Sequence, residues 1–107
     1  MNSLSSHVLD TTLGKPAAGM QLQLTAPNGQ TVQGQTDCNG RCNNWQDISV
    51  EPGVYCLRFN TGEYLQSAHG SGFYPHVDIH FTVAQDGGHY HIPLLISPYG
   101  FSSYRGS

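Results

Sequence analysis

The sequence predicts an all-β sandwich, and two observations lead to that fold class. The 107 residues include 13 glycines and 6 prolines. Because each glycine or proline inside a helix costs roughly 1 or 3 kcal/mol, a helical bundle is excluded. Short stretches of alternating apolar and polar residues, separated by turn signals, are typical of β-strands. A chain of this length holds one hydrophobic core, so residues 1–107 are expected to form a single domain.

The first predicted strands lie at residues 20–26 and 31–36. Apolar side chains alternate with polar ones over residues 20–26, from Met20 to Ala26. The segment Pro27-Asn28-Gly29 then supplies a turn signal. Residues 31–36 return as a mostly polar strand.

A loop is expected over residues 37–47, with a second turn at Asn39-Gly40. Its Asp37-x-Asn39-x-Arg41 pattern superficially suggests a calcium loop. An arginine at the fifth position argues against calcium, so a plain turn is the better interpretation. Cys38 and Cys42 have a spacing that a zinc site tolerates, but one such pair supplies only half a site.

The middle of the chain predicts one more strand and the only helix. Residues 54–59 are rich in β-formers and follow a Pro-Gly turn signal. Asn60 offers an N-cap, with Glu63 three residues later, so a short helix is expected over about residues 62–68. Residues 69–75 are expected to form a loop.

The last third predicts two strands, at residues 77–83 and 90–96, joined by a tight turn at residues 85–88. Paired as a hairpin, their apolar faces coincide and contribute to the core. Because Pro93 lacks a backbone donor, its strand is expected at a sheet edge or to carry a bulge there. The opposite face of the pair collects polar residues, namely Asp78, His80, Thr82, His89 and His91.

The surface is polar but weakly charged, which limits the partners. Only 10% of residues are charged and the net charge is −3, whereas an ordinary domain carries about 25% charged residues. This composition suggests that other subunits cover part of the surface. Nucleic acids and acidic membranes are excluded as partners, because the basic residues are too few: Lys15, Arg41, Arg58 and Arg105.

Three cysteines are too few for a disulfide framework, and their odd number argues the same way. Three thiols fit a reducing compartment. The N-terminal residues show no basic or apolar signal-peptide regions, and no apolar run approaches the ~20 residues that span a bilayer. A cytoplasmic protein is expected.

His89 and His91 flank one residue, which puts both imidazoles on one side of a strand. This spacing suits zinc, with His80 as a third ligand, but no fourth ligand is clearly placed. Solvated or interface histidines are the favoured alternative. A buried arginine could also bind a planar oxyanion through two hydrogen bonds. From the residues alone, the chain is a β-sandwich with a histidine-rich outer face and no named substrate.

Several segments resemble the transthyretin-related 5-hydroxyisourate hydrolases. The resemblance runs from His7 to Ser107 and is most specific at both ends. It is carried by the segments HVLDT (7–11), GKPA (14–17), TDCNGR (36–41), TGEY (61–64), FYP (73–75), HYHIPLLISPYG (89–100) and YRGS (104–107).

This resemblance implies a transthyretin-like (prealbumin-like) sandwich of two four-stranded antiparallel sheets with one short helix. It also implies a homotetramer, a dimer of dimers, with active sites at the dimer–dimer interface. The implied reaction is hydrolysis of 5-hydroxyisourate to 2-oxo-4-hydroxy-4-carboxy-5-ureidoimidazoline. Water opens a cyclic amide in this reaction, without a metal or another cofactor.

The site residues follow from the same resemblance. His7, Arg41, His91 and Ser107 are implied as catalytic, and Tyr104, Arg105 and Gly106 complete the substrate-binding set. One of the two histidines is expected to deprotonate water while the other orients or donates, and the sequence leaves open which one does which. Arg41 is expected to bind the anionic substrate. His89 is expected to be exposed or to support the site, and Arg105 has a structural role as its alternative.

Two other functions remain as alternatives at this point. The first is a transthyretin-like protein that binds small aromatic ligands between subunits, which would have no need of His7, His91 and the YRGS tail together. The second is a zinc hydrolase that uses His80, His89 and His91.

Overall fold

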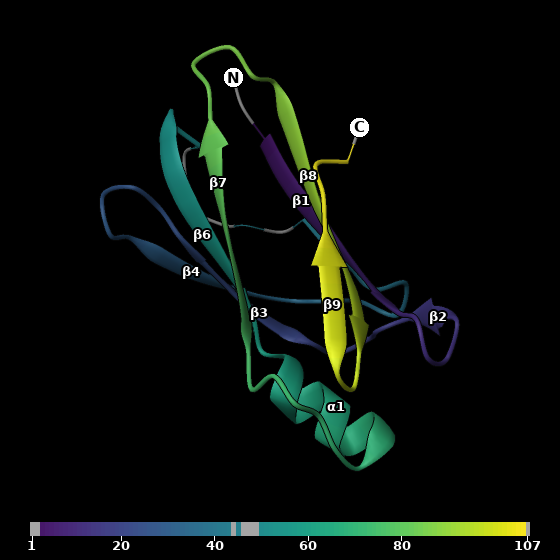
Figure 1. Cartoon of the computed structure of the whole chain (residues 1–107). Coiled ribbons are helices and arrows are strands. Elements are labelled where there is room, and N and C mark those ends of the chain that lie inside the picture. The colour runs from purple at the N-terminus through teal and green to yellow at the C-terminus, as the bar shows by residue number, and fades with distance from the viewer. Residues whose placement is uncertain (1–2, 44, 46–49, 107) are drawn as a thin grey trace.

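Two β-sheets pack face to face, with one helix at the end of the sandwich (Figure 1). The computed structural model describes residues 3–43, 45 and 50–106. The first sheet has the order β2-β1-β8-β9 with β5 also paired to β1, and the second has the order β4-β3-β6-β7. The predicted all-β sandwich is confirmed. The elements are β1 (Ser3–Asp10), β2 (Lys15–Pro16), β3 (Gln21–Thr25), β4 (Thr31–Gln35), β5 (Arg41–Cys42), β6 (Gly53–Phe59), α1 (Thr61–His69), β7 (Val77–Val83), β8 (His89–Ser97) and β9 (Gly100–Ser103).

The second sheet follows the alternation of its sequence. Its strands pair antiparallel throughout, β3 with β4 and β6, and β6 with β7. Leu22 and Leu24 of β3 are fully buried, whereas Gln21, the first residue of the strand, is exposed. β6 shows the same alternation, as expected where alternate side chains point to opposite faces of a sheet. β3, β4 and β6 thus confirm the strands predicted at residues 20–26, 31–36 and 54–59.

Strand β1, at the centre of the first sheet, was not predicted from the apolar pattern. Its inward-facing row is Leu4, Ser6, Val8 and Asp10, all buried. Two of these four residues are polar, so the apolar alternation is broken. The strand runs parallel to β8 over its whole length. The expectation of two four-stranded antiparallel sheets is therefore corrected for the first sheet, which is mixed and has five strands among the described residues.

The hairpin predicted between residues 77–83 and 90–96 is wrong. Both strands form, but β7 pairs with β6 in the second sheet, while β8 pairs with β1 and β9 in the first. Each strand has one apolar face, and these faces meet across the sandwich. The connection between them crosses from one sheet to the other, where the Ala84 amide donates to the Tyr90 hydroxyl at 2.8 Å. His80 therefore lies on a different sheet from His89 and His91.

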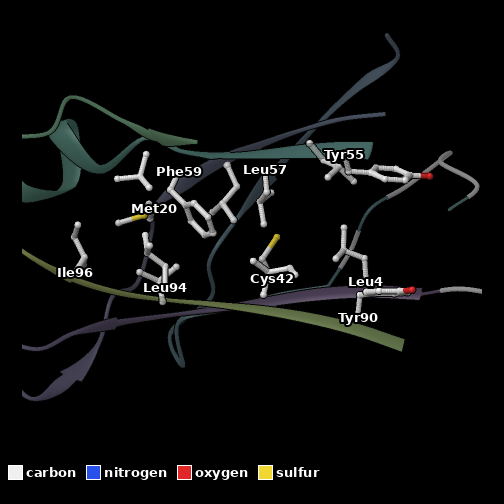
Figure 2. Close-up of a cluster of buried hydrophobic side chains, with 14 of the residues drawn as sticks. Leu4, Met20, Cys42, Tyr55, Leu57, Phe59, Tyr90, Leu94 and Ile96 are labelled. Carbon is white, nitrogen blue, oxygen red and sulfur yellow. The ribbon is translucent and has the colours of Figure 1, made fainter. Parts of the chain in front are cut away.

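The core fills the space between the two sheets (Figure 2). Tyr55, Leu57 and Phe59 of β6 face Leu4 of β1 and Leu94 of β8, and all five are buried. Burial of one such side chain contributes about 1.5–3 kcal/mol. The core thus fixes the two central strands of the first sheet, whose outer face carries the site described below.

Helix α1 spans Thr61–His69, one residue longer at each end than predicted. Asn60 stands at the N-cap, but its side chain makes no capping hydrogen bond, so the expected capping box does not form. Instead, the Thr61 hydroxyl donates to the Tyr74 carbonyl at 2.8 Å, which holds the helix start against the following loop. Within the described residues, no helix has the length and apolar character to cross a membrane.

Asp10 ties this helix to the first sheet. Its fully buried carboxylate accepts hydrogen bonds from the Tyr64 hydroxyl and from Nε2 of His69, both at 2.7 Å. The other carboxylate oxygen accepts from the amides of Thr12 and Leu13. Burial alone would raise the pKa of Asp10, but the hydrogen bonds from His69 and Tyr64 outweigh it and lower that pKa. Asp10 is therefore held as a carboxylate.

Candidate active site

The outer face of the first sheet brings together residues from three strands. In the ladder, His7 of β1 lies opposite Arg41 of β5 and beside Pro93 of β8. Two residues earlier in β1, on the same face as His7, Ser5 lies beside His91 of β8. His91 in turn pairs with Gly106. Partners across a sheet share a face. His7, Arg41 and His91 therefore point to the same side, although they are far apart in the sequence.

The turn before β5 places Arg41. The Asp37 carboxylate accepts hydrogen bonds from the amides of Asn39 and Arg41, at 2.9 and 3.0 Å. Gly40 has φ +74°, and a Cβ there would lie 2.5 Å from the Val8 carbonyl oxygen, so only glycine fits against β1. The plain turn expected for this segment is confirmed, and it sets the exposed Arg41 beside His7.

The tautomer of His7 follows from its partner. Its Nε2 lies 3.0 Å from the backbone carbonyl oxygen of Asn39. A carbonyl can only accept, so Nε2 carries the proton and donates. Nδ1 is consequently the ring nitrogen that neutral His7 has available as an acceptor. The same turn that places Arg41 thus also orients His7.

His91 is half-buried, and its ring centroid lies 6.5 Å from that of His7. Its Nδ1 is 2.8 Å from the Ser5 hydroxyl. Burial lowers the pKa of His91 below its ordinary value of 6.5, and the nearby charges of Arg41, His7 and His89 lower it further. At neutral pH the His91 imidazole is therefore uncharged, which is the form that accepts a proton.

The C-terminal segment runs beside His91. The Gly106 amide donates to the His91 carbonyl at 2.8 Å, in the same register that pairs Ser103 with Leu94. This register puts Tyr104 level with Pro93, where the ladder is interrupted because proline has no N–H. The prediction that the strand of Pro93 lies at an edge or is bulged is wrong. β8 has neighbours on both sides, and its register with β1 and with the C-terminal segment is the same before and after Pro93. A Cβ on Gly106 would lie 2.5 Å from Cδ2 of His91, so the segment packs directly on the ring.

The other residues considered for a site lie in different parts of the molecule. Arg105 lies away from the histidines, with its guanidinium carbon 4.3 Å from the centre of the Tyr90 ring on the core-facing side of β8. Tyr104 is exposed, and Ser107 lies outside the described residues. The zinc set fails geometrically, because His80 belongs to the second sheet. Cys42 is buried in the core whereas Cys38 is exposed, so this pair does not converge either.

Ser5 and Asn39 were missed by the sequence analysis. Ser5 stands two residues before His7, so strand alternation alone would have placed it on the same face. That placement requires residues 3–10 to form a strand, which their apolar pattern does not predict. Asn39 acts through its backbone carbonyl, which leaves no mark in the side-chain pattern.

Comparisons with known proteins show which family has this sequence and fold. The model of the HIUase/transthyretin family matches residues 4–106. A probable 5-hydroxyisourate hydrolase of Schizosaccharomyces pombe is 43% identical over 114 residues, covering 98% of this chain and 91% of the relative. The structure of Klebsiella pneumoniae 5-hydroxyisourate hydrolase is 34% identical, with a TM-score of 0.88 over 100% of this chain and 94% of that one. Transthyretin from Sparus aurata is 26% identical, with a TM-score of 0.85 over 97% and 96% of the two chains.

Proposed function

The chain belongs to the HIUase/transthyretin family, and on that premise we propose that residues 1–107 form a single 5-hydroxyisourate hydrolase domain. The observation that carries the proposal is the convergence of His7, Arg41 and His91 on one sheet face. Among the solved structures, the 5-hydroxyisourate hydrolase is more similar to this chain than the transthyretin, at 34% identity against 26%. The reaction opens the six-membered ring of the substrate by water and gives 2-oxo-4-hydroxy-4-carboxy-5-ureidoimidazoline.

In this proposal His91 is the general base. Its lowered pKa keeps the ring neutral, and because Ser5 contacts Nδ1, Nε2 is the ring nitrogen left for the attacking water. Nε2 takes a proton from water as the oxygen attacks the amide carbonyl, and it returns a proton to the leaving nitrogen. Such acid–base catalysis supplies about 10²- to 10⁴-fold in rate.

Arg41 binds the anionic substrate and offsets the negative charge that develops on the attacked carbonyl oxygen. Its guanidinium is exposed beside His7, so it is accessible to a ligand on this face. His7 holds the substrate or the attacking water through Nδ1, because Nε2 already donates to Asn39.

Tyr104 and Ser107 add hydrogen bonds from the C-terminal segment, and Gly106 lets that segment approach His91. Arg105 has the structural role, over Tyr90.

The proposed base predicts how activity depends on pH. Because His91 must be neutral and its pKa lies below 6.5, kcat/KM should fall only as the pH drops below that value. The Arg41→Gln variant lacks one of the charges that lower this pKa, so its acid limb should move toward higher pH. Initial rates across the acid range measure both midpoints. A wild-type midpoint above 6.5 would assign the titration to another group.

The close contact of Gly106 with His91 predicts a sensitive position. In the Gly106→Ala variant the new methyl group must displace the His91 ring, and misplacement by about 1 Å can cost 10²-fold in rate. We expect kcat to fall by about that factor. Gly100→Ala is the matched control, because its Cβ would be at an ordinary 3.5 Å from the Ser97 hydroxyl. Equal activity of the two variants would remove the C-terminal segment from the catalytic machinery.

We also propose a homotetramer, a dimer of dimers. Phe73, Tyr99 and Phe101 are large exposed aromatic residues, and Tyr74 joins Phe73 to Phe101 by edge-on contacts at 5.0 Å between ring centroids. Association would bury this aromatic patch. Light scattering of active protein should give four times the chain mass of 11.6 kDa. Full activity at the mass of one chain would contradict the assembly.

The cytoplasm is the proposed location, since the three cysteines, all among the described residues, are thiols.

The test of the proposed function is the decay of 5-hydroxyisourate generated from urate by urate oxidase. We expect the protein to accelerate this decay, with no change after treatment with a chelator. Activity that is lost to the chelator and restored by zinc would replace the metal-free mechanism by a metal-dependent one. Tight binding of the substrate without faster decay would favour a transthyretin-like binding protein.

A further inference from the structure

A chain of hydrogen bonds leads away from His91 along the outer face of the first sheet. The Ser5 hydroxyl contacts Nδ1 of His91 at 2.8 Å and Nε2 of His89 at 2.9 Å. The Ser3 hydroxyl contacts the other nitrogen of His89, Nδ1, at 2.6 Å. The parallel register of β1 and β8 creates this alternation, because it pairs Ser3 with His89 and Ser5 with His91. The chain runs from the half-buried His91 to the exposed His89 and Ser3.

The single proton of the Ser5 hydroxyl couples the two imidazoles. If Ser5 donates to Nε2 of His89, Nδ1 of His91 must carry a proton and donate to Ser5. If Ser5 instead donates to His91, Nε2 of His89 must carry the proton. For neutral rings, the first arrangement gives both histidines a proton on Nδ1, and the second gives both a proton on Nε2. The two rings therefore always share one tautomer, and only the first leaves Nε2 of His91 able to accept.

We infer that Ser5, His89 and Ser3 form a proton relay that sets the tautomer of His91 and carries its surplus proton to solvent. This inference rests on the proposed function, with His91 as the base. Ser5 and His89 are positioning residues in this scheme, because they act on the substrate only through His91.

The relay step moves one proton without changing any other bond. Nε2 of His91 takes a proton from the attacking water, and its Nδ1 proton passes to the Ser5 oxygen. The original Ser5 proton passes to Nε2 of His89, and the Nδ1 proton of His89 passes to the Ser3 oxygen, whose own proton goes to bulk water. His91 ends neutral with its proton on Nε2, ready for donation to the leaving nitrogen. The reverse sequence, with a proton taken up from bulk water, restores the first tautomer.

The surroundings of His91 supply a reason for such a relay. The charged and titratable groups acting on it are Arg41 from β5, His7 from β1 and His89 from its own strand, and each disfavours a positive charge on the ring. Gly106 covers the ring from the C-terminal segment and adds no charge. A proton gained during catalysis is therefore destabilised at His91. At the exposed end of the hydrogen-bond chain, beside Ser3, water solvates the proton instead.

The experiment compares Ser5→Ala with Ser5→Thr, which keeps a hydroxyl, and with Ser102→Ala, an exposed serine of the same sheet. We expect Ser5→Ala to lower kcat by roughly 10- to 100-fold with KM little changed, and the other two to stay near wild type. In mixtures of H₂O and D₂O, wild type and Ser5→Thr should show a curved dependence of kcat on deuterium content, because several protons move in the same rate-limiting step. Ser5→Ala should show a straight line. Unchanged kcat and curvature in Ser5→Ala would overturn the relay.

A measurement without substrate separates this inference from the proposed function. Nitrogen-15 NMR of the neutral histidines should show His89 and His91 in the same tautomer in the wild type, and this agreement should be lost in Ser5→Ala. Different tautomers in the wild type would refute the coupling. If the tautomers agree but 5-hydroxyisourate decays at its spontaneous rate, the proposed function fails while the coupling stands.

Discussion

The His91→Asn variant is expected to lose about 10²- to 10⁴-fold in kcat while keeping its fold, because it removes the proposed base. Asparagine retains a polar group near Ser5 but has no nitrogen that accepts a proton at neutral pH. His91 is half-buried on the outer face of the sheet, so the core loses no apolar contact and the melting temperature should change little. Steady-state kinetics and thermal melting on the same sample give both quantities.

His80→Asn is the matched control for this prediction. It makes the same chemical change on an exposed position of β7, in the other sheet, and turnover should be unaffected. Turnover of His91→Asn within a few-fold of wild type would move the role of base to His7, whose Nδ1 is available as an acceptor on this face. Equal losses in both variants would point to a general effect of removing histidine.

The Asp10→Ala variant is expected to lose about 3–5 kcal/mol of the free energy of unfolding, because it breaks a buried charged network. The carboxylate is fully buried and receives four hydrogen bonds. Its removal leaves the Tyr64 hydroxyl and Nε2 of His69 without their acceptor and separates helix α1 from the first sheet. Denaturant titration followed by circular dichroism measures the loss.

Two comparisons make the stability prediction specific. Asp86→Ala removes an exposed carboxylate and should stay within about 0.5 kcal/mol of wild type. The folded-state pKa of Asp10 lies below 3.8, so its contribution is complete above pH 3.8 and is lost as the pH falls through the folded value. In Asp10→Ala this part of the acid destabilisation should be missing. A loss under 1 kcal/mol at neutral pH would show that the network contributes little.

Local pattern predicted most strands and the pairing of β3 with β4, but not the partners of β7 and β8. Residues 20–26 and 54–59 carry a one-sided apolar pattern that tertiary packing preserves, and both form as predicted. The hairpin failed at β7 and β8 because an apolar face looks the same whether it packs beside a neighbour or across the core. β1 was not predicted because the polar residues Ser6 and Asp10 occupy inward positions. There the Ser6 hydroxyl donates to the Ile92 carbonyl, and Asp10 accepts from Tyr64 and His69.

The site was predictable only as far as sequence motifs reach. His7, Arg41 and His91 came from the family resemblance, since no spacing rule connects β1, β5 and β8. Their proximity depends on the parallel β1–β8 pairing and on the close approach of Gly40 to Val8. Arg105 was assigned to the site because it belongs to the YRGS segment of the resemblance, yet strand alternation places it on the face opposite Gly106.

The central claim is that this sheet face catalyses many turnovers and does not merely bind. The most direct measurement is the number of 5-hydroxyisourate molecules consumed per chain, above spontaneous decay, with substrate in large excess and wild type compared with His91→Asn. We predict that wild type consumes many equivalents and yields 2-oxo-4-hydroxy-4-carboxy-5-ureidoimidazoline, while His91→Asn remains close to the spontaneous rate. Consumption by wild type of no more than one equivalent per chain would contradict the account.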